Sequence, residues 1–318
     1  MEMLKMRHIE TRQNTETRAT SNGKFSLAVL IACITLVAIT SPAIAEEPYS
    51  VAWISQLGTS GSDYSYAVAV DSNGNAYISG KTDGSLDGNS AGLTDAFLAK
   101  YDSSGASVWI RQLGTSTHDV SESVAVDSAG NTYISGWTWG SLDGNNAGLT
   151  DAFLAKYDSS GTWQWTRQLG TASNDYSKSV AIDSNDNVYI SGHTEGSLDG
   201  NSAGSADAFL AKYNSSGVWQ WTRQLGTSEW DASRSVAVDS NGNAYISGYT
   251  EGSLDGNNVG LDDAFLAKYD SSGVWLWTRQ LGTEWDDKSY SVAVDSADNA
   301  YISGLTNGSL DGNNVGFQ

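Results

Sequence analysis

The sequence predicts an all-β fold built from repeated four-stranded sheets. A unit of 56 residues recurs along the chain, and each copy contains short β-branched and aromatic runs bounded by Gly, Asn, Asp and Ser, which is typical of strands and turns. The only prolines are Pro42 and Pro48, so no expected strand is interrupted. A fixed period of this size indicates modules that bury their apolar faces against one another. Each unit begins with Gln-Leu-Gly-Thr, at Gln56, Gln112, Gln168, Gln224 and Gln280.

The second unit illustrates the four strands expected in each copy. The first strand, Ser123–Asp127, and the second, Thr132–Gly136, are joined by a tight Ser-Ala-Gly-Asn turn. The third strand, Asp151–Tyr157, is followed by Ser-Ser-Gly, and the fourth strand is Trp163–Arg167. Strands joined in this order form an up-and-down antiparallel sheet. The two short turns should therefore lie at one end of the sheet and the two long connections at the other.

Apolar side chains occur on both faces of the expected strands. Val124 and Ala125 point to opposite faces, as do Phe153 and Leu154. A sheet that is apolar on both faces must be covered on both, and four-stranded sheets packed face to face around an axis make a β-propeller. We therefore expect residues 46–318 to form a β-propeller of four-stranded antiparallel blades, about five in number, with the last incomplete. A β-solenoid is the main alternative, but its coils usually repeat at shorter periods and lack regular antiparallel hairpins.

The repeated unit resembles a known family. The string VAVDSNGNAYISG, followed by DAFLAKYDSSG and a tryptophan-bearing strand, is similar to the bacterial SBBP β-propeller repeat. The resemblance covers essentially all of residues 49–318, because five copies agree in order and spacing. It implies an exported bacterial propeller, and it implies no established catalytic residues.

The ends of the repeat region do not coincide with whole blades. Tyr49–Ser55 aligns with the fourth strand of a unit, with Trp53 in register with Trp109. The fifth unit stops at Phe317 and Gln318, where a third strand would begin. We expect the N-terminal strand to close the ring against the incomplete last blade. The alternative is an open arc from a truncated gene.

Residues 1–45 are expected to be a signal peptide. Phe25–Thr40 is apolar and uncharged, and the small residues that follow it predict cleavage between Ala45 and Glu46. The apolar run is shorter than the roughly 20 residues that cross a bilayer. An uncleaved anchor and a lipoprotein with a lipidated Cys33 are the alternatives. We therefore expect a secreted, periplasmic or cell-surface protein with no membrane span in the mature chain.

The charge balance limits the classes of partner. The chain has 37 Asp and Glu against 17 Lys and Arg, a formal net charge of −20. This argues strongly against nucleic acid, whose phosphates need a basic surface, and against anionic membranes. A protein or a glycan remains as a partner of what we expect to be a monomer. Because Cys33 is the only cysteine, the mature chain should have no disulfide and should depend on core burial.

Comparison of the copies identifies a candidate ligand-binding face. The long connections gather at one end of each sheet, and loops on a rigid scaffold commonly carry binding residues. The copies differ there directly after the second-strand glycine, two residues later, and around the position before a recurring aspartate, which is Asp119 in the second unit. Such variation fits a diversified recognition surface, and drift at unconstrained loop tips is the alternative. The candidate residues are His118, Trp137, Trp139, His193, Trp230, Tyr249 and Trp285.

The tryptophans of the fourth strands are expected to pack between blades. They occupy two positions that lie two residues apart, and burying each indole would contribute roughly 1.5–3 kcal/mol or more. One position holds Trp109, Trp165, Trp221 and Trp277, and the other holds Trp163, Trp219 and Trp275.

The Asp and Asn residues of the SLDGNNAG-type loops raise the hypothesis of calcium binding. In the second unit, Asp143, Asn145 and Asp151 could supply hard oxygen ligands, but their spacing fits neither an EF-hand nor the nonapeptide repeat. The same side chains also stabilise turns by bonding their own backbone, and both interpretations stay open. The residues concerned are Asp87, Asn89, Asp95, Asp143, Asn145, Asp151, Asp199, Asn201, Asp207, Asp255, Asn257 and Asp263. No other cofactor is expected.

Catalysis has little support in the sequence. After the signal peptide the chain has only His118 and His193, at non-equivalent positions, and it has no Cys nucleophile, G-x-S-x-G elbow or glycine-rich phosphate loop. We therefore expect an exported, non-catalytic propeller that serves as a binding or surface interaction scaffold. One alternative is a lectin-like module that holds sugars through loop Trp, Asp and Asn side chains. The other is a cryptic extracellular hydrolase that would use a pair of carboxylates.

Overall fold

The computed structural model describes residues 27–30 and 51–310 of the chain. Two compact units are present, Met1–Gln56 and Leu57–Gln318. In the first unit, strand β1 (Leu27–Leu30) pairs in parallel with strand β2 (Val51–Ser55). The expected cleavage site between Ala45 and Glu46, the lipidation candidate Cys33, and the C-terminal Phe317 and Gln318 lie outside the described residues.

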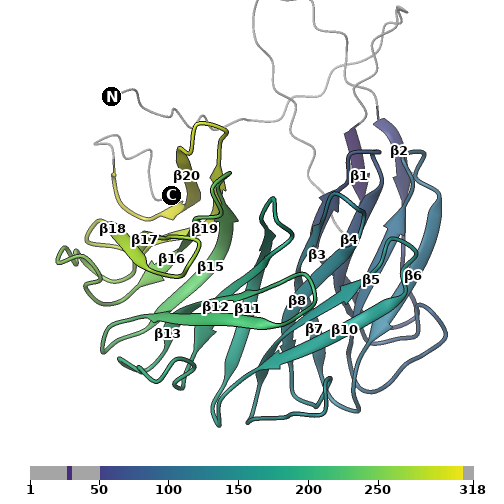
Figure 1. The fold of residues 1–318 in the computed structure, drawn as a ribbon, viewed down its shortest axis with the longest axis horizontal. Helices are drawn as coiled ribbons and strands as arrows, with labels where there is room; N and C mark the ends of the chain where they lie inside the picture. The colour runs from purple at the N-terminus through teal and green to yellow at the C-terminus, as the bar shows by residue number, and fades with distance from the viewer. Residues whose placement is uncertain (1–26, 31–50, 311–318) are drawn as a thin grey trace, which may run out of the picture. The chain divides into compact units, whose positions relative to one another are not determined.

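The second unit consists of antiparallel sheets in which consecutive strands pair (Figure 1). Each of the first four sheets contains four strands, and the last contains two. We call these sheets blades one to five. Their strands are β3 (Asp63–Val70), β4 (Ala76–Thr82), β5 (Asp95–Tyr101) and β6 (Ser107–Leu113); β7 (Asp119–Val126), β8 (Thr132–Thr138), β9 (Asp151–Tyr157) and β10 (Trp163–Leu169); β11 (Asp175–Ile182), β12 (Val188–Thr194), β13 (Asp207–Tyr213) and β14 (Trp219–Leu225); β15 (Asp231–Val238), β16 (Ala244–Thr250), β17 (Asp263–Tyr269) and β18 (Trp275–Leu281); and β19 (Asp287–Val294) and β20 (Ala300–Thr306).

The first strand of each blade is longer than the sequence pattern predicts. In blade two it begins at Asp119, four residues before the expected Ser123. The pairing of β7 with β8 shifts between Ser121 and Ser123, so Glu122 occupies a β-bulge. Gly136 lies opposite this irregularity, where a Cβ would approach the carbonyl oxygen of residue 120 to 1.8 Å. The second-strand glycine is therefore required by the close approach of the two backbones.

Neighbouring blades pack face to face, and the apolar core lies in the seams between them. One buried cluster joins Tyr77 and Leu98 of blade one to Val124 and Phe153 of blade two. Equivalent clusters lie between blades two and three and between blades three and four. The first strands β3, β7, β11, β15 and β19 contact one another in order, whereas the fourth strands chiefly contact the third strand of their own blade. This arrangement confirms a β-propeller fold and excludes a solenoid.

The first row of strand tryptophans packs in these seams as expected. Trp165 is only 9% exposed. Its ring meets Tyr133 edge-on at 6.1 Å between ring centroids, and the Arg167 guanidinium lies over it at 5.4 Å. From the next blade, the turn at Gly217 (φ 74°) lies so close that a Cβ there would come within 2.8 Å of the indole. Trp277, at the same position in blade four, is only partly buried, and we call Trp109, Trp165, Trp221 and Trp277 the seam tryptophans.

The expectation that the second row is buried is wrong. Trp163 is 55% exposed, and Trp219 and Trp275 are exposed to nearly the same extent. The register of β10 against β9 shifts between Trp163 and Trp165, so Gln164 occupies a bulge that separates the two indoles. The same shift occurs in blades three and four. We call Trp163, Trp219 and Trp275 the rim tryptophans.

Closure of the ring by the N-terminal strand stays a prediction, because β2 belongs to the other compact unit, where it is hydrogen-bonded to β1. The last sheet contains β19 and β20 alone among the described strands, so the last blade is incomplete, as expected. The ends of the blade series accordingly expose residues that are buried elsewhere, such as Val68 and Tyr301.

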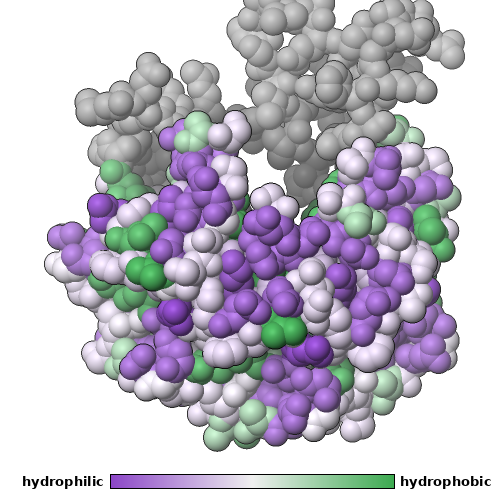
Figure 2. All heavy atoms as spheres, in the orientation of Figure 1, coloured by the Kyte–Doolittle hydropathy of each residue, from purple (hydrophilic) through white to green (hydrophobic). Residues whose placement is uncertain are grey.

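The surface shown in Figure 2 is mainly hydrophilic, with small separate apolar patches. In the part of the chain that the structure describes, no helix is long and apolar enough to span a membrane.

Candidate functional site

The long connections gather at one end of each blade and are tied across the seams. The connection between β4 and β5 meets the connection between β6 and β7, where the Asp119 N–H donates to the carbonyl of Thr94 at 2.8 Å. The Trp139 N–H donates to the carbonyl of His118 at 2.9 Å. The corresponding bonds recur at the later seams. The backbone at the variable loop positions is therefore fixed by hydrogen bonds.

The recurring aspartate anchors this end of the blade. One oxygen of Asp119 accepts from the N–H and hydroxyl of Thr115, at 2.6 and 2.9 Å, and the other accepts from the hydroxyl of Thr138. Burial raises the pKa of the Asp119 carboxyl above its ordinary value, and the charge of Asp95 adds to the effect, while these hydrogen bonds oppose it. The Asp119 carboxylate therefore joins the connection before β7 to the end of β8.

Three of the four residues of the Gln-Leu-Gly-Thr marker have a structural explanation. Gln112 accepts from the Leu86 N–H at 2.6 Å and donates to Asp95 at 2.9 Å, so it clamps the connection after β4. Gly114 lies against the other Asp95 oxygen, which a Cβ would approach to 2.0 Å. Thr115 binds the recurring Asp119, as described above. These contacts give the marker a structural role in the scaffold.

Most of the sequence-predicted binding residues meet in one continuous row of rings. His118 contacts Trp139 edge-on at 4.7 Å between ring centroids, and Trp139 lies 6.2 Å from Trp137. The row continues from Trp137 to Tyr176 at 5.8 Å and from Tyr176 to His193 at 4.9 Å. It ends at Trp230, 5.4 Å from His193. We call His118, Trp139, Trp137, Tyr176, His193 and Trp230 the aromatic row; it crosses blades two, three and four.

Sequence comparison missed Tyr176, which links the two halves of the row. This residue lies in the first strand, directly opposite His193 in the sheet register, just as residue 120 lies opposite Trp137. The position varies between copies as widely as the loop positions do, with Tyr64, Val120, Tyr176, Ala232 and Lys288. It was overlooked because the first strand was expected to begin after it.

Charged side chains from the bulges of the first strands lie beside the aromatic row. Glu122 accepts from the Trp137 indole N–H at 3.1 Å and pairs with Lys178 at 2.6 Å. In blade four, Arg234 donates to the Tyr249 hydroxyl at 2.9 Å. Tyr249 is buried beside the row and is not one of its ring contacts. In each of these three blades the bulge residue is charged, and its side chain lies at this surface.

His193 is the buried ring of the row, next to its end at Trp230. Its Nδ1 atom has no hydrogen-bond partner in the described part of the chain. Burial lowers the pKa of His193 from 6.5 to about 3, and the charges of Lys178 and Arg234 act in the same direction. The imidazole is therefore neutral at pH 7 and packs as an aromatic ring.

Trp285 stands apart from the row, as Tyr249 does. Trp285, in the connection to the last blade, is largely exposed, and its backbone N–H donates to Thr283 at 3.3 Å. It takes part in none of the ring contacts between the described residues. Within the row itself, Trp139 is the most exposed ring, with 48% of its surface accessible.

The loop carboxylates considered for calcium make hydrogen bonds to the protein. Asp143 accepts from the Asn145 N–H at 2.9 Å and from the Gln168 N–H at 2.8 Å. Asp151 accepts from the Ala147 N–H and from the Gln168 side chain. Among the residues that the structure describes, no group of three or more His, Cys, Asp or Glu side chains is placed to hold a metal ion. The turn interpretation accounts for these hydrogen bonds, but the Oδ1 atom of Asp151 is buried without a partner among the described residues, and calcium binding stays a prediction.

A family model agrees with this repeated architecture. The model for the SBBP beta-propeller repeat matches residues 52–87, 108–143, 164–199, 220–262 and 276–311, which together make up more than half of the chain. The chain belongs to the SBBP beta-propeller repeat family. The matched segments centre on the Gln-Leu-Gly-Thr marker and the hairpin after it, which are the parts of the SBBP unit that build the seams.

Two curated proteins are similar in sequence. An uncharacterized WD repeat-containing protein, L264 of Acanthamoeba polyphaga mimivirus, is 24% identical over 88% of this chain and 20% of its own length. The regulatory protein FlaEY of Caulobacter vibrioides is 31% identical over 55% of this chain and 20% of its own length. This SBBP chain therefore spans only about a fifth of the length of the curated relatives that it matches.

Solved structures also match, at low similarity. The gluconolactonase XC5397 of Xanthomonas campestris has a TM-score of 0.40 and 13% identity, over 76% of this chain and 69% of that one. A protein of unknown function from Bacteroides caccae has a TM-score of 0.34 and 10% identity, over 68% of this chain and 81% of that one.

Proposed function

We propose that this SBBP propeller is an exported, non-catalytic interaction scaffold that binds a protein partner through the aromatic row. The single observation that carries the proposal is the row itself. Six rings from three blades lie in continuous contact at the end where the long connections meet. Interfaces depend on a few Trp, Tyr and Arg anchors, and this surface supplies all three residue types.

The scaffold around the row supports binding rather than chemistry. The marker residues, the recurring aspartates and the seam tryptophans are all engaged in contacts within the scaffold. His193 is neutral and packed between rings. A rigid frame with variable residues at one end is the arrangement expected of a recognition surface.

A displayed library of random peptides, selected on the wild-type protein, tests this proposal. We expect enriched peptides rich in apolar and aromatic residues, because these complement the indoles of the row. Trp139→Ala should weaken the binding of these peptides about tenfold or more, as for a central interface anchor.

Trp285→Ala is the matched control, because Trp285 is also an exposed loop tryptophan but lies outside the row. It should leave peptide affinity within about twofold, since it removes no central anchor. Enriched peptides that bind Trp139→Ala as well as they bind wild type would show that the row is not the contact surface.

A further inference from the structure

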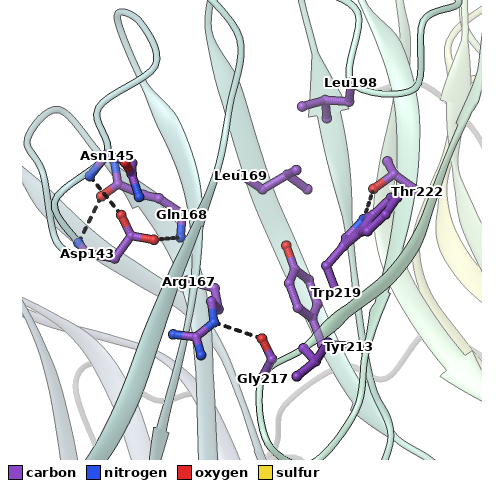
Figure 3. A pocket seen from close by; sticks show the side chains of 11 residues that line it. Asp143, Asn145, Arg167, Gln168, Leu169, Leu198, Tyr213, Gly217, Trp219 and Thr222 are labelled. Atoms are coloured by element: carbon purple, nitrogen blue, oxygen red, sulfur yellow. Dashed lines mark hydrogen bonds between the residues drawn. The ribbon is translucent and has the colours of Figure 1, made fainter.

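Two open grooves with equivalent linings lie at the outer edge of the seams, away from the first strands. The groove between blades two and three has a volume of about 560 Å³, and the groove between blades one and two has a volume of about 510 Å³. Volumes of this size are typical of small-molecule sites. Figure 3 shows the first of them, with Arg167 and Asn145 on the side of blade two and Trp219 and Tyr213 on the side of blade three.

The polar groups in this groove are only partly satisfied by the protein. Arg167 donates through Nε to the Gly217 carbonyl and through Nη1 to the Thr166 carbonyl, both at 2.7 Å, and its Nη2 has no partner in the described part of the chain. The ring of Tyr213 is buried, yet its hydroxyl lies in the groove and makes no hydrogen bond with the described residues. The side-chain amide of Asn145 is likewise unused, because only its backbone N–H is bonded. Three donor groups therefore remain available to a ligand.

The rim tryptophan supplies an apolar wall. Trp219 is 56% exposed, although a large aromatic ring is normally buried. Its indole N–H donates to the Thr222 hydroxyl at 3.0 Å, which fixes the orientation of the ring (Figure 3). Trp163 and Trp275 make the same bond to Thr166 and Thr278. An exposed indole held in one orientation is preorganised to receive a flat apolar surface.

Among the described fourth strands, the rim tryptophan and its threonine partner occur in the three blades that pack against a preceding blade. The tryptophan comes from the following blade, and the arginine and asparagine come from the preceding one. Blade one has no described blade packed before it, and its fourth strand carries Ser107 and Ile110 at the positions of the tryptophan and the threonine. The third seam repeats the full set, with the Arg223 Nε donating to the Gly273 carbonyl at 2.7 Å beside Trp275. Blades two, three and four thus carry the residues of three equivalent grooves, two of which are the cavities described above.

We propose that each groove binds a neutral sugar unit of a carbohydrate chain. The C–H face of a pyranose ring would pack on the rim indole, and its hydroxyl groups would bond Arg167, Asn145 and the Tyr213 hydroxyl. One Arg and one Asp face each groove, so the site has no net charge to offer an ion. The formal net charge of −20 disfavours anionic sugars. Three equivalent sites on one scaffold would give a polymer higher avidity than any single site provides.

This inference goes beyond the proposed function, because it uses different residues and a different class of ligand. A glycan array with the wild-type protein tests it first. Calorimetry with maltotriose, cellotriose, xylotriose and chitotriose, or with the trisaccharide of the glycan class that the array identifies, then counts the sites. We expect about three sites per chain for the bound trisaccharide, and about two in Trp219→Ala, because one groove of the array is lost while the others are unchanged.

The combined variant Trp163→Ala, Trp219→Ala and Trp275→Ala should bind the trisaccharide at least about tenfold more weakly. Because these indoles are exposed, its melting temperature should stay within about 2 °C of wild type. Trp219→Phe, which keeps an aromatic face, should retain three sites per chain, and so should Trp139→Ala. An array without any neutral glycan bound, or a combined variant that binds as well as wild type, would overturn the proposal. An effect of Trp139→Ala alone would assign the sugar to the aromatic row instead.

Discussion

The seam and rim tryptophans differ in environment although they lie two residues apart on the same strands. Trp165 is 9% exposed between two blades, whereas Trp163 is 55% exposed at the edge of a groove. In a regular strand both side chains would point to the same face. The bulge at Gln164 breaks this relation in β10. The same residue type therefore builds the core at one position and an accessible surface at the next.

The difference shows how this repeat separates stability from recognition. The seam tryptophan contacts Tyr133, Arg167 and the turn at Gly217, so it forms part of the contact with the next blade. The rim tryptophan contacts its own strand through Thr166 and otherwise faces the groove. Changes at the rim can accordingly alter binding without disturbing the blades.

The largest expected effect comes from truncating a seam tryptophan. Trp165→Ala should lower the free energy of unfolding by about 3–5 kcal/mol, because it leaves a cavity between two blades. Trp163→Ala is the paired control and should change it by no more than about 0.5 kcal/mol, as for other exposed sites. Denaturant unfolding followed by circular dichroism measures both. Equal losses in the two variants would contradict the separation of roles.

A smaller effect is expected from the buried histidine of the aromatic row. The pKa of His193 is about 3 in the folded protein and rises to its ordinary 6.5 on unfolding, so the proton binds mainly to the unfolded chain and acidification below about pH 6.5 favours unfolding. At pH 5 this should cost about 2 kcal/mol relative to pH 7. His193→Phe should remove the loss, because phenylalanine takes up no proton.

Buried aspartates such as Asp119 act in the opposite sense, since their raised pKa values make folding more favourable as the pH falls from 7 toward 4. They are present in both proteins, so they cancel when the pH dependence of wild type is compared with that of His193→Phe. Urea unfolding at pH 7 and pH 5 gives this difference. Parallel pH profiles for the two proteins would show that His193 is not held neutral.

The smallest expected change in the free energy of unfolding tests whether a neighbouring blade is what buries the first-strand valine. Val124 and Val68 occupy the same position in blades two and one, but Val124 is 7% exposed and Val68 is 62% exposed. Val124→Ala should cost about 1–2 kcal/mol through lost burial. Val68→Ala should stay within about 0.5 kcal/mol. A comparable loss at Val68 would indicate that its face is covered in solution.

Local pattern and repetition were enough to predict the blades and most of the aromatic row. Each hairpin is specified by its own turn residues, and five copies of one pattern leave little ambiguity about the order of the strands. The side chains that differ between copies, such as Trp137 and His193, can be recognised because everything around them is the same. The buried Trp165 position could also be predicted, because an indole repeated in register on a two-sided sheet must be covered.

Only the tertiary structure decided which tryptophans remain exposed, where the first strands begin, and which strand β2 joins. The exposure of Trp163 and the place of Glu122 both follow from bulges, which shift the alternation of side chains by one residue and leave no clear signal in composition. Tyr176 joins the aromatic row because rings from neighbouring blades meet across a seam. Contacts between blades join residues that are distant in sequence, such as Trp165 and Gly217. For that reason the sequence alone determined the modules, while their packing determined the surfaces available for binding.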